Sequence, residues 1–401
     1  KSLVGSEMCI RDSPIADLLA HPLDLLLNLS ASPYGQGKMA LRRRLAGRAA
    51  ARLGCPVVYV NQVGGNDELV FDGASFVVDA GGETRFQMAC GREDLGLWEA
   101  SSAAPVTGAS PDPALDEQLL RILVLGLRDY ARKCGFQTAL LGLSGGIDSG
   151  LVAVLACAAL GAEWVRALLM PSPYSSRGSI EDATALAGRL GLATATLPIA
   201  PLMAAFDAAL SPALGGAPTA VAAENLQSRI RGTLLMALAN QEGRLLLSTG
   251  NKSELAVGYC TLYGDMNGGL SVIGDLYKTT VFRLCSWIDS PAAAPCRAEL
   301  GLPPSGELIG AAIRGKPPSA ELKPDQRDTD SLPPYEVLDP LLQASIEDLA
   351  SPEELILRGA DAALAERVHR LLRRAEFKRR QAAPVLKVSG RSFGSGWRMP
   401  I

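Results

Sequence analysis

Residues 141–150, with the sequence LGLSGGIDSG, carry the groups needed to bind phosphate. An apolar run stops there at a Ser/Gly turn and restarts as an Ala/Leu-rich segment typical of a helix. Gly145 and Gly146 let the backbone approach an anion in conformations that a Cβ forbids, and Ser144 and Ser149 add hydroxyl donors. The expected helix directs its positive end toward the same turn. The pattern therefore predicts a phosphate-binding loop.

Asp148 is the one charged residue in this loop. A carboxylate beside bound phosphates is explained if Mg²⁺ lies between them, because Mg²⁺ is usually held by one or two carboxylates and phosphate oxygens. The loop lacks the Gly-Lys-Ser/Thr ending of kinase-type phosphate loops and the G-x-G-x-x-G of dinucleotide folds. SGGxDS after a strand instead resembles the pyrophosphate loop of ATP pyrophosphatases, which adenylate a substrate. A strand-to-helix turn without a ligand is the alternative.

A second buried run ends in the same way at LLLSTGNKSE, residues 245–254. Glu254 could supply a further magnesium oxygen opposite Asp148, although an acid in a first helical turn is also stabilising through the helix dipole. The following Gly-rich loop 258–269 contains two tyrosines suited to stack on a flat ring. Lys278 lies in the next segment, 274–279, and a lysine reaching phosphates would offset the charge that builds up as pyrophosphate leaves.

Three further segments have weaker signals. Residues 224–231 (ENLQSRIR) are expected to open a helix with Arg229 and Arg231 on different faces, so that one could meet a ligand, although solvent exposure is the simpler interpretation. The Pro-rich stretch 303–336 is predicted to be a surface loop of the kind that forms lids. The basic segment 377–381 indicates a solvated helix face or a phosphate clamp rather than a nucleic-acid site.

Composition limits the class of protein that carries these loops. With 401 residues and 48% hydrophobic content the chain is long enough for two or three domains with buried cores. A net charge of −3 argues against a general nucleic-acid or membrane-surface binder. Its eight cysteines form no CxxC pair, which favours reduced thiols in the cytoplasm. No apolar run reaches the ~20 residues of a membrane span.

Two regions separated by a Pro/Gly/Ser-rich linker are expected to position the loops. In the first, strands at 23–29 and 57–60, a helix at 39–53 and a hairpin over 71–83 suggest an α/β layered domain. In the second, a helix from Ala114 precedes strands at 138–143, 164–170, 193–198 and 244–247 that alternate with helices. This order predicts a parallel, doubly wound sheet whose ligands bind beyond the carboxyl ends of the strands.

Five motifs in one order identify a family resemblance: SGGIDS, ENLQSRIRG, STGNKSELAVGYCTLYGDMNGGLSVIGDLYKT, PPSAELKPDQRDTDSLPPYEVLD and KRRQAAPVLKVSGRSFGSGWRMPI. Together they resemble the glutamine-dependent NAD⁺ synthetases over residues 115–401. Residues 14–105 resemble the last part of the nitrilase-like glutaminase domain of that family. The resemblance implies a Rossmann-like synthetase domain of the adenine nucleotide alpha hydrolase type, preceded across a linker at 106–114 by a partial α/β/β/α domain.

The resemblance also implies a reaction and its residues. Deamido-NAD⁺ would attack ATP to give an adenylate and pyrophosphate, and ammonia would then displace AMP, so that the enzyme is a carbon–nitrogen ligase. By position, ATP would be held by Gly142, Leu143, Ser144, Gly145, Gly146, Ile147, Asp148, Ser149, Thr249, Lys278 and Ser319. Deamido-NAD⁺ would be held by Asn225, Arg229, Glu254 and Lys378, and Mg²⁺ by Asp148 and Glu254. Asp148, Lys278 and Glu254 would be the catalytic set, and the protein would form a homo-oligomer.

The N-terminal region departs from the family pattern. The family's glutaminase cysteine lies in Cys-Glu-Asp-x-Trp, whereas Cys9 is followed by Ile-Arg-Asp. We expect residues 1–13 to be a translated adapter sequence, Ser32 and Lys38 to mark a remnant of the glutamine-binding edge, and free ammonia to be the nitrogen donor of this chain. Leu262 and Gly269 replace a lysine and an aspartate of the ammonia-only branch, so those contacts do not transfer.

Two alternatives remain from sequence. One is another SGGxDS amidotransferase, such as a GMP or asparagine synthetase, which the loops at 248–254 and 259–265 disfavour. The other is an inactive or scaffolding fragment with exposed strand edges and apolar surface.

Overall fold

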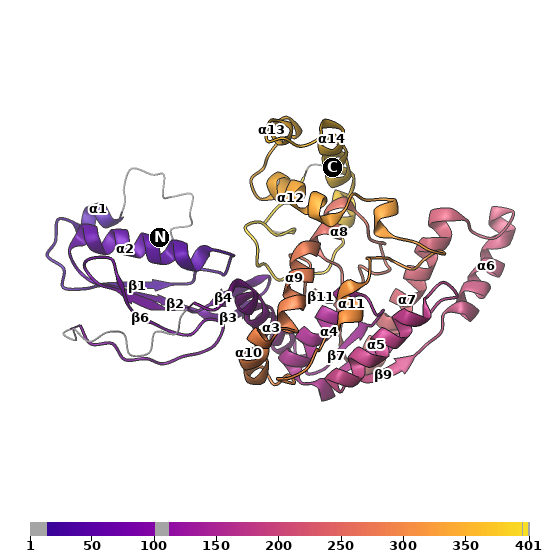
Figure 1. The fold of residues 1–401 in the computed structure, drawn as a ribbon, viewed down its shortest axis with the longest axis horizontal. Helices are drawn as coiled ribbons and strands as arrows, with labels where there is room; N and C mark the ends of the chain where they lie inside the picture. The colour runs from indigo at the N-terminus through magenta and orange to yellow at the C-terminus, as the bar shows by residue number, and fades with distance from the viewer. Residues whose placement is uncertain (1–13, 101–111, 395, 400–401) are drawn as a thin grey trace. The chain divides into compact units, whose positions relative to one another are not determined.

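The computed structural model describes residues 14–100, 112–394 and 396–399, and divides the chain into two compact units (Figure 1). The first comprises Lys1–Gly64 and Val70–Ile122, and the second Gly65–Leu69 and Leu123–Ile401. The expected adapter sequence at 1–13, including Cys9, and residues 106–111 of the expected linker lie outside the described residues.

The first unit is a mixed four-stranded sheet with one long helix packed on it. The order is β1-β2-β5-β6, with β1 and β2 parallel and the other pairs antiparallel. Ala46 and Ala50 of the helix pack against Val57, Tyr59 and neighbouring residues of the strands. The bounds are α1 Pro14–Leu18, β1 Leu26–Ser30, α2 Lys38–Leu53, β2 Val57–Asn61, β5 Phe76–Val78 and β6 Thr84–Gln87.

The expected hairpin over 71–83 is divided between two sheets. Its second half is confirmed, since β5 and β6 pair across a turn in which Asp79 accepts hydrogen bonds from the backbone of Gly81 and Glu83. Its first half is wrong as a continuous strand. Gly73 and Ala74 adopt positive φ angles of 62° and 48° and break it, so β4 (Leu69–Asp72) pairs with β3 (Val63–Asn66) instead.

The second unit is built on a five-stranded parallel sheet of order β11-β10-β7-β8-β9, which confirms the predicted α/β fold. Near-continuous apolar runs form the central strands because both faces are covered. Leu140, Leu168 and Leu246 face helix α7, and α4 and α5 contact β7 and β8. The strands are β7 Ala139–Gly142, β8 Val165–Leu169, β9 Ala193–Thr196, β10 Leu245–Ser248 and β11 Leu270–Ser271.

Helices alternate with the strands of this sheet, and α8, α12, α13 and α14 pack together on one side of it (Figure 1). The described part of the chain contains no helix with the length and apolar character of a membrane span. The bounds are α3 Leu115–Lys133, α4 Ile147–Leu160, η2 Ala162–Trp164, α5 Arg177–Leu190, α6 Ala200–Leu214, α7 Ala220–Glu242, α8 Lys252–Val257, α9 Lys278–Ile288, η3 Pro291–Ala293, α10 Ala294–Glu299, α11 Ala311–Gly315, η4 Asp328–Asp330, α12 Tyr335–Ile346, α13 Pro352–Leu357, α14 Ala362–Arg374 and α15 Glu376–Arg379.

The strand order reverses at β7. From β7 the chain moves to β8 and β9 on one side, and later returns to β10 and β11 on the other. In open parallel sheets, ligands bind outside the carboxyl ends of the strands at such a reversal. The loops after β7 and β10 both lie there, so the two predicted ligand-facing turns are neighbours.

Candidate functional site

The loop between β7 and α4 is shaped by its own serines. Ser144 and Ser149 place their hydroxyl oxygens 3.1 Å apart, and the Ser144 hydroxyl accepts from the backbone N–H of Gly146 at 3.2 Å. The Ser149 hydroxyl donates to the carbonyl of Gly146 at 3.0 Å. These bonds fix the turn at the amino end of α4, where the backbone N–H groups and the helix dipole favour an anion.

Gly145 has a packing reason to be glycine in addition to its place in the loop. Its φ is 80°, and a Cβ there would lie 2.1 Å from the carbonyl oxygen of Ser179 on α5. The carbonyl oxygen of Gly145 accepts a hydrogen bond from Lys316 at 3.4 Å. A side chain at this position would therefore separate the phosphate loop from α5.

The turn after β10 is closed by a capping box. The Asn251 side chain accepts from the backbone N–H of Glu254 at 3.0 Å, and the Glu254 carboxylate accepts from the Asn251 backbone N–H at 3.5 Å. Asn251 also donates from Nδ2 to Oδ1 of Asp148 at 2.9 Å. This buried amide therefore joins the two strand ends directly.

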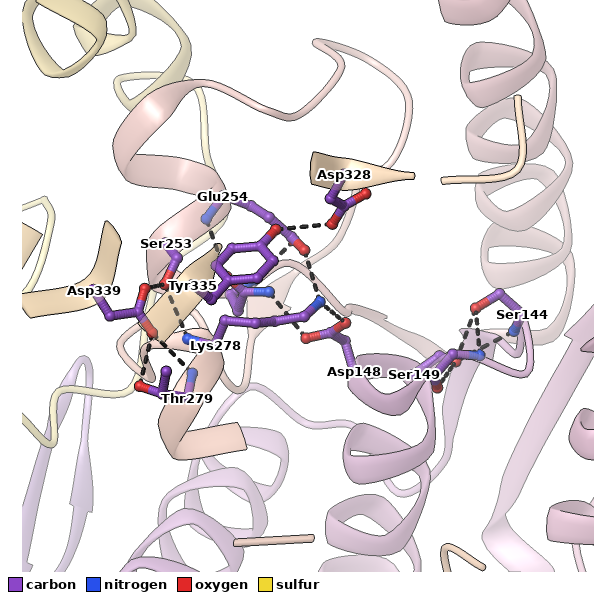
Figure 2. A network of polar contacts seen from close by, with 12 residues as sticks. Ser144, Asp148, Ser149, Ser253, Glu254, Lys278, Thr279, Asp328, Tyr335 and Asp339 are labelled. Atoms are coloured by element: carbon purple, nitrogen blue, oxygen red, sulfur yellow. Dashed lines mark hydrogen bonds and ion pairs between the residues drawn. The ribbon is translucent and has the colours of Figure 1, made fainter. Parts of the chain in front are cut away.

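Lys278 lies between the two carboxylates that these strand ends contribute (Figure 2). Its ammonium nitrogen is 2.5 Å from Asp148 Oδ2 and 3.1 Å from Glu254 Oε1, and only 3% of the side chain is exposed. The ring of Tyr335 lies over the same nitrogen, with its centroid 5.5 Å away. The site thus contains one cation shared by two acids at the carboxyl edge of the sheet.

Burial and charge together set the protonation of this cluster. Burial raises the pKa of Glu254 to about 7, opposed by the charge of Lys278 and assisted by the charges of Asp148 and Asp328. For Lys278 burial acts to lower the pKa, but the two adjacent carboxylates outweigh it and the pKa lies above its ordinary value. Lys278 is therefore a fixed positive charge across the physiological range.

A cavity of about 590 Å³ opens between the two loops. Its floor is formed by the phosphate loop, the ends of β8 and β10 and the first turns of α8 and α9. The segment 316–328, from the loop predicted to be a lid, lines the opposite wall. Glu321 anchors that segment, because its carboxylate accepts from the hydroxyls of Ser176 and Ser179 at 2.9 and 2.7 Å.

Most of the residues assigned to ATP line this cavity. They are Gly142, Leu143, Ser144, Gly146, Ile147, Asp148, Ser149, Thr249, Lys278 and Ser319. Glu254, which was assigned to deamido-NAD⁺ and to Mg²⁺, lines it as well. Gly145 does not line it and packs on α5 instead.

Three residues assigned to deamido-NAD⁺ lie outside the cavity lining and hold the loop 258–262. The Asn225 side chain accepts from the Thr261 hydroxyl at 3.0 Å, and Arg229 donates to the carbonyl of Leu262 at 3.2 Å. Lys378 donates to two further carbonyls of that loop. Of the two arginines on this helix, Arg231 and not Arg229 lines the cavity.

Helix α7 also differs from its prediction. It begins at Ala220, one turn before the expected start at 224, because Thr219 in extended conformation precedes it. Ser32 and Lys38 lie in the first unit. The hydroxyl and carbonyl of Ser32 accept from Arg42, whose guanidinium also pairs with the buried Asp72.

Several side chains that line the cavity or hold its walls were not predicted from the sequence. Asn251 was recognisable from its spacing to Glu254, which is that of a capping box. Ser176 and Glu321 are separated by 145 positions, and nothing local in the sequence pairs them. Lys316 reaches Asp182 and the Ser179 hydroxyl from the lid segment, again through tertiary contact.

The carboxylates fit a divalent cation. The described ranges contain no group of three or more His, Cys, Asp or Glu side chains that could hold a metal. Asp148 and Glu254, however, already converge on a single positive charge. Two carboxylates facing a phosphate-binding loop are the donor set that Mg²⁺ uses when phosphate oxygens and water complete its shell.

Comparisons with known proteins show similarity to one family. The family model described as NAD synthase matches residues 119–382. The glutamine-dependent NAD(+) synthetase of Synechocystis sp. is 54% identical over 97% of this chain and 68% of its own length. The solved glutamine-dependent NAD⁺ synthetase of Acinetobacter baumannii, in complex with adenosine diphosphate, is 39% identical with a TM-score of 0.70 over 96% of this chain and 69% of its own. The NH₃-dependent NAD synthetase of Campylobacter jejuni is 26% identical with a TM-score of 0.51 over 66% of this chain and 96% of its own.

Proposed function

The chain belongs to the NAD synthase family, and on that premise we propose that it amidates deamido-NAD⁺ to NAD⁺ at the expense of ATP. The observation that carries the proposal is Lys278 held between Asp148 and Glu254 beside the phosphate loop. A fixed cation at that point can stabilise the negative charge that develops on a leaving pyrophosphate.

ATP is assigned to the cavity between the two loops. The relative from A. baumannii was solved in complex with adenosine diphosphate. In this chain, the loop 144–149 at the amino end of α4 has the backbone N–H groups that bind a phosphate chain. In this assignment Thr249 and Ser319 flank the nucleotide from the β10 turn and from the lid segment. The GMP and asparagine synthetase alternative is not favoured, since the relatives are NAD synthetases.

Adenylation is the first of two chemical steps. A carboxylate oxygen of the nicotinate group attacks the α-phosphorus of ATP, and the bond from that phosphorus to the bridging oxygen of pyrophosphate breaks. The electron pair of that bond leaves with pyrophosphate, whose charge Lys278 faces. Burial of Lys278 strengthens this interaction, because few water molecules screen it.

Ammonia completes the reaction. Its nitrogen attacks the carbonyl carbon of the adenylate, the carbon–oxygen bond to AMP breaks, and the nitrogen loses a proton. The names of the relatives make glutamine the nitrogen source of those proteins. Both donors are therefore compared in the test of this proposal.

We assign Mg²⁺ to the two carboxylates that contact Lys278. Asp148 and Glu254 would hold the ion, which would neutralise phosphate charge and orient the triphosphate when ATP is bound. Asn251 holds Asp148 through a 2.9 Å hydrogen bond to Oδ1.

A homo-oligomer is proposed from one apolar surface of the second unit. Helix α6 has no buried residue although it is rich in alanine and leucine. Phe206 and Leu214 are exposed on it, and Val221 is exposed on the adjoining start of α7. Exposed apolar surface is typical of protein interfaces, and we propose that these side chains form one that a second copy of the chain covers.

The reaction is tested by supplying the purified chain with deamido-NAD⁺, ATP, Mg²⁺ and either ammonium or glutamine. The proposal expects NAD⁺, AMP and pyrophosphate in equal amounts with ammonium. ADP and phosphate as products, or no NAD⁺ with either donor, would contradict it. Product with glutamine would contradict the expectation that free ammonia is the donor of this chain.

A further inference from the structure

The charged centre of the site depends on three helices that meet at their first turns. Asp148 lies in the first turn of α4, Glu254 in the first turn of α8, and Lys278 is the first residue of α9. Hydrogen bonds within each helix cannot set the distance between two helices. Contacts between α8 and α9 must therefore fix where Lys278 stands relative to Glu254.

A buried ring of hydrogen bonds provides these contacts (Figure 2). The Ser253 hydroxyl accepts from the backbone N–H of Lys278 at 2.9 Å and donates to Oδ1 of Asp339 at 2.6 Å. Oδ2 of Asp339 accepts from the backbone N–H and the hydroxyl of Thr279, at 2.8 and 2.7 Å. Ser253 precedes Glu254 and Thr279 follows Lys278, so the ring closes one residue away from each catalytic side chain.

Helix α12 contributes a second contact to the same lysine. Tyr335 lies one turn before Asp339 and therefore on the same face of α12. Its ring covers the ammonium group of Lys278, and its hydroxyl donates to Asp328 at 2.8 Å. One face of α12 thus supports Lys278 at its backbone and at its charged end.

We propose that Asp339 is a positioning residue for adenylation, which places Lys278 and Glu254 by holding α8 and α9 together; the proposal rests on the proposed function. A carboxylate is needed because Ser253 and Thr279 both donate to it. An amide would present an N–H group to at least one of these donors and leave a buried group unpaired. Asp339 touches neither phosphate loop nor cavity, so it acts only through its neighbours.

The test compares two carboxylates, one beside each end of α9. Asp339→Asn alters the anchor at the amino end. Asp289→Asn is the matched control, because Asp289 is buried beside the other end and accepts from three backbone N–H groups of residues 308–310. Both variants are expected to lower the melting temperature, since each leaves a buried donor poorly paired.

Only the Asp339 variant is expected to change the chemistry. In the ammonium-dependent assay kcat should fall about 10- to 100-fold while KM for ATP stays within about twofold, because a small misplacement of Lys278 acts on the transition state. Asp289→Asn should keep kcat within about twofold. Adding Ser253→Ala to Asp339→Asn should cost much less than the product of the two single losses, because both act through one ring.

Either of two results would overturn the proposal: a stable Asp339→Asn enzyme with the kcat of the parent, or losses that multiply in the double variant. If Asp339→Asn does not fold, Ser253→Ala and Thr279→Val replace it as the test. An unchanged kcat in both of these variants would contradict the proposal. A parent chain that makes no NAD⁺ contradicts the proposed function itself. An activity that depends on Lys278 but not on Asp339 contradicts only the positioning role of Asp339.

Discussion

At the scale of single residues, the site is a balance of one lysine against two acids. Removing charges from water is costly, and a buried ion pair is maintained only when its partners are close and well hydrogen-bonded. Lys278 meets this condition through Asp148 and Glu254, and Asn251 satisfies a further oxygen of Asp148. The same arrangement places a positive charge in the lining of the cavity to which we assign ATP.

Lys278→Met should reduce kcat for NAD⁺ formation by about 10²- to 10³-fold, the usual cost of removing one group that stabilises a developing oxyanion. It should also lower the melting temperature, because two neighbouring carboxylates lose their shared cation. Activity at saturating ATP measures the first effect. Lys133→Met, at the far end of α3 where the lysine contacts Gly65, is the control and should behave as the parent. Equal activity of the two variants would remove Lys278 from the mechanism.

Asp148→Asn tests the magnesium assignment without requiring turnover. In the parent, ATP with Mg²⁺ at 100 times the dissociation constant should add about 2.7 kcal/mol to the free energy of unfolding, a rise of roughly 5–10 °C in melting temperature. The variant should lose most of this rise, whereas ATP without Mg²⁺ should give a small rise in both proteins. An undiminished Mg²⁺-dependent rise in the variant would place the ion elsewhere.

At the scale of elements, the basic C-terminal segment has a structural use. Arg379 is buried and donates to the carbonyls of Leu255 and Ala256 at the end of α8, and it pairs with the buried Glu376. The sequence predicted a solvated face or a phosphate clamp there, and for Arg379 both are wrong. Helix α8 is short and leaves its last carbonyls unpaired, so a cation at its end satisfies them.

Arg379→Met should lower the free energy of unfolding by about 3–5 kcal/mol, because it removes the buried partner of Glu376 and leaves that buried carboxylate with only the half-exposed Arg380. Arg380 pairs with the same glutamate from a half-exposed position and provides the matched control. Arg380→Met should change the free energy by less than about 1 kcal/mol. Urea unfolding followed by circular dichroism measures both. Similar losses for the two variants would show that burial of the pair does not matter.

Elements with a strong local signal were predictable, and contacts across the fold were not. The four main strands of the second unit were predicted from their alternation with helices. The two turns that follow β7 and β10 were predicted from apolar runs that end in Gly and Ser. Strand β11 was missed because two residues show no period. The ring around Asp339 could not be predicted, since Asp339 is 60 positions from Thr279 and 86 positions from Ser253.

At the scale of the whole molecule, the apolar surface of α6 is one of the exposed apolar features of a single copy. Phe206 is 43% exposed at its centre. A charge placed on a face that is buried between two copies is strongly unfavourable, whereas a charge on a solvated face costs little. A charge introduced on α6 should therefore weaken self-association if α6 is an interface, and leave it unchanged if the apolar side chains are simply exposed to solvent.

Phe206→Asp should shift the sedimentation profile from dimer or larger species to monomer at micromolar concentration. Leu357→Asp is the control, because Leu357 is 86% exposed on α13 and lies outside the proposed surface. It should sediment as the parent does. A parent that is already monomeric, or a Phe206 variant that still associates, would contradict the proposed surface.

The central claim is that the carboxylate of deamido-NAD⁺ is adenylated in the cavity beside Lys278. The most direct measurement uses deamido-NAD⁺ labelled with ¹⁸O in the nicotinate carboxylate, with ATP, Mg²⁺ and ammonium, followed by mass spectrometry of the products. Because that oxygen attacks the α-phosphorus and stays with it when ammonia displaces AMP, one ¹⁸O should appear in each AMP and none in pyrophosphate. NAD⁺ formed with unlabelled AMP, or ¹⁸O in inorganic phosphate, would contradict the claim.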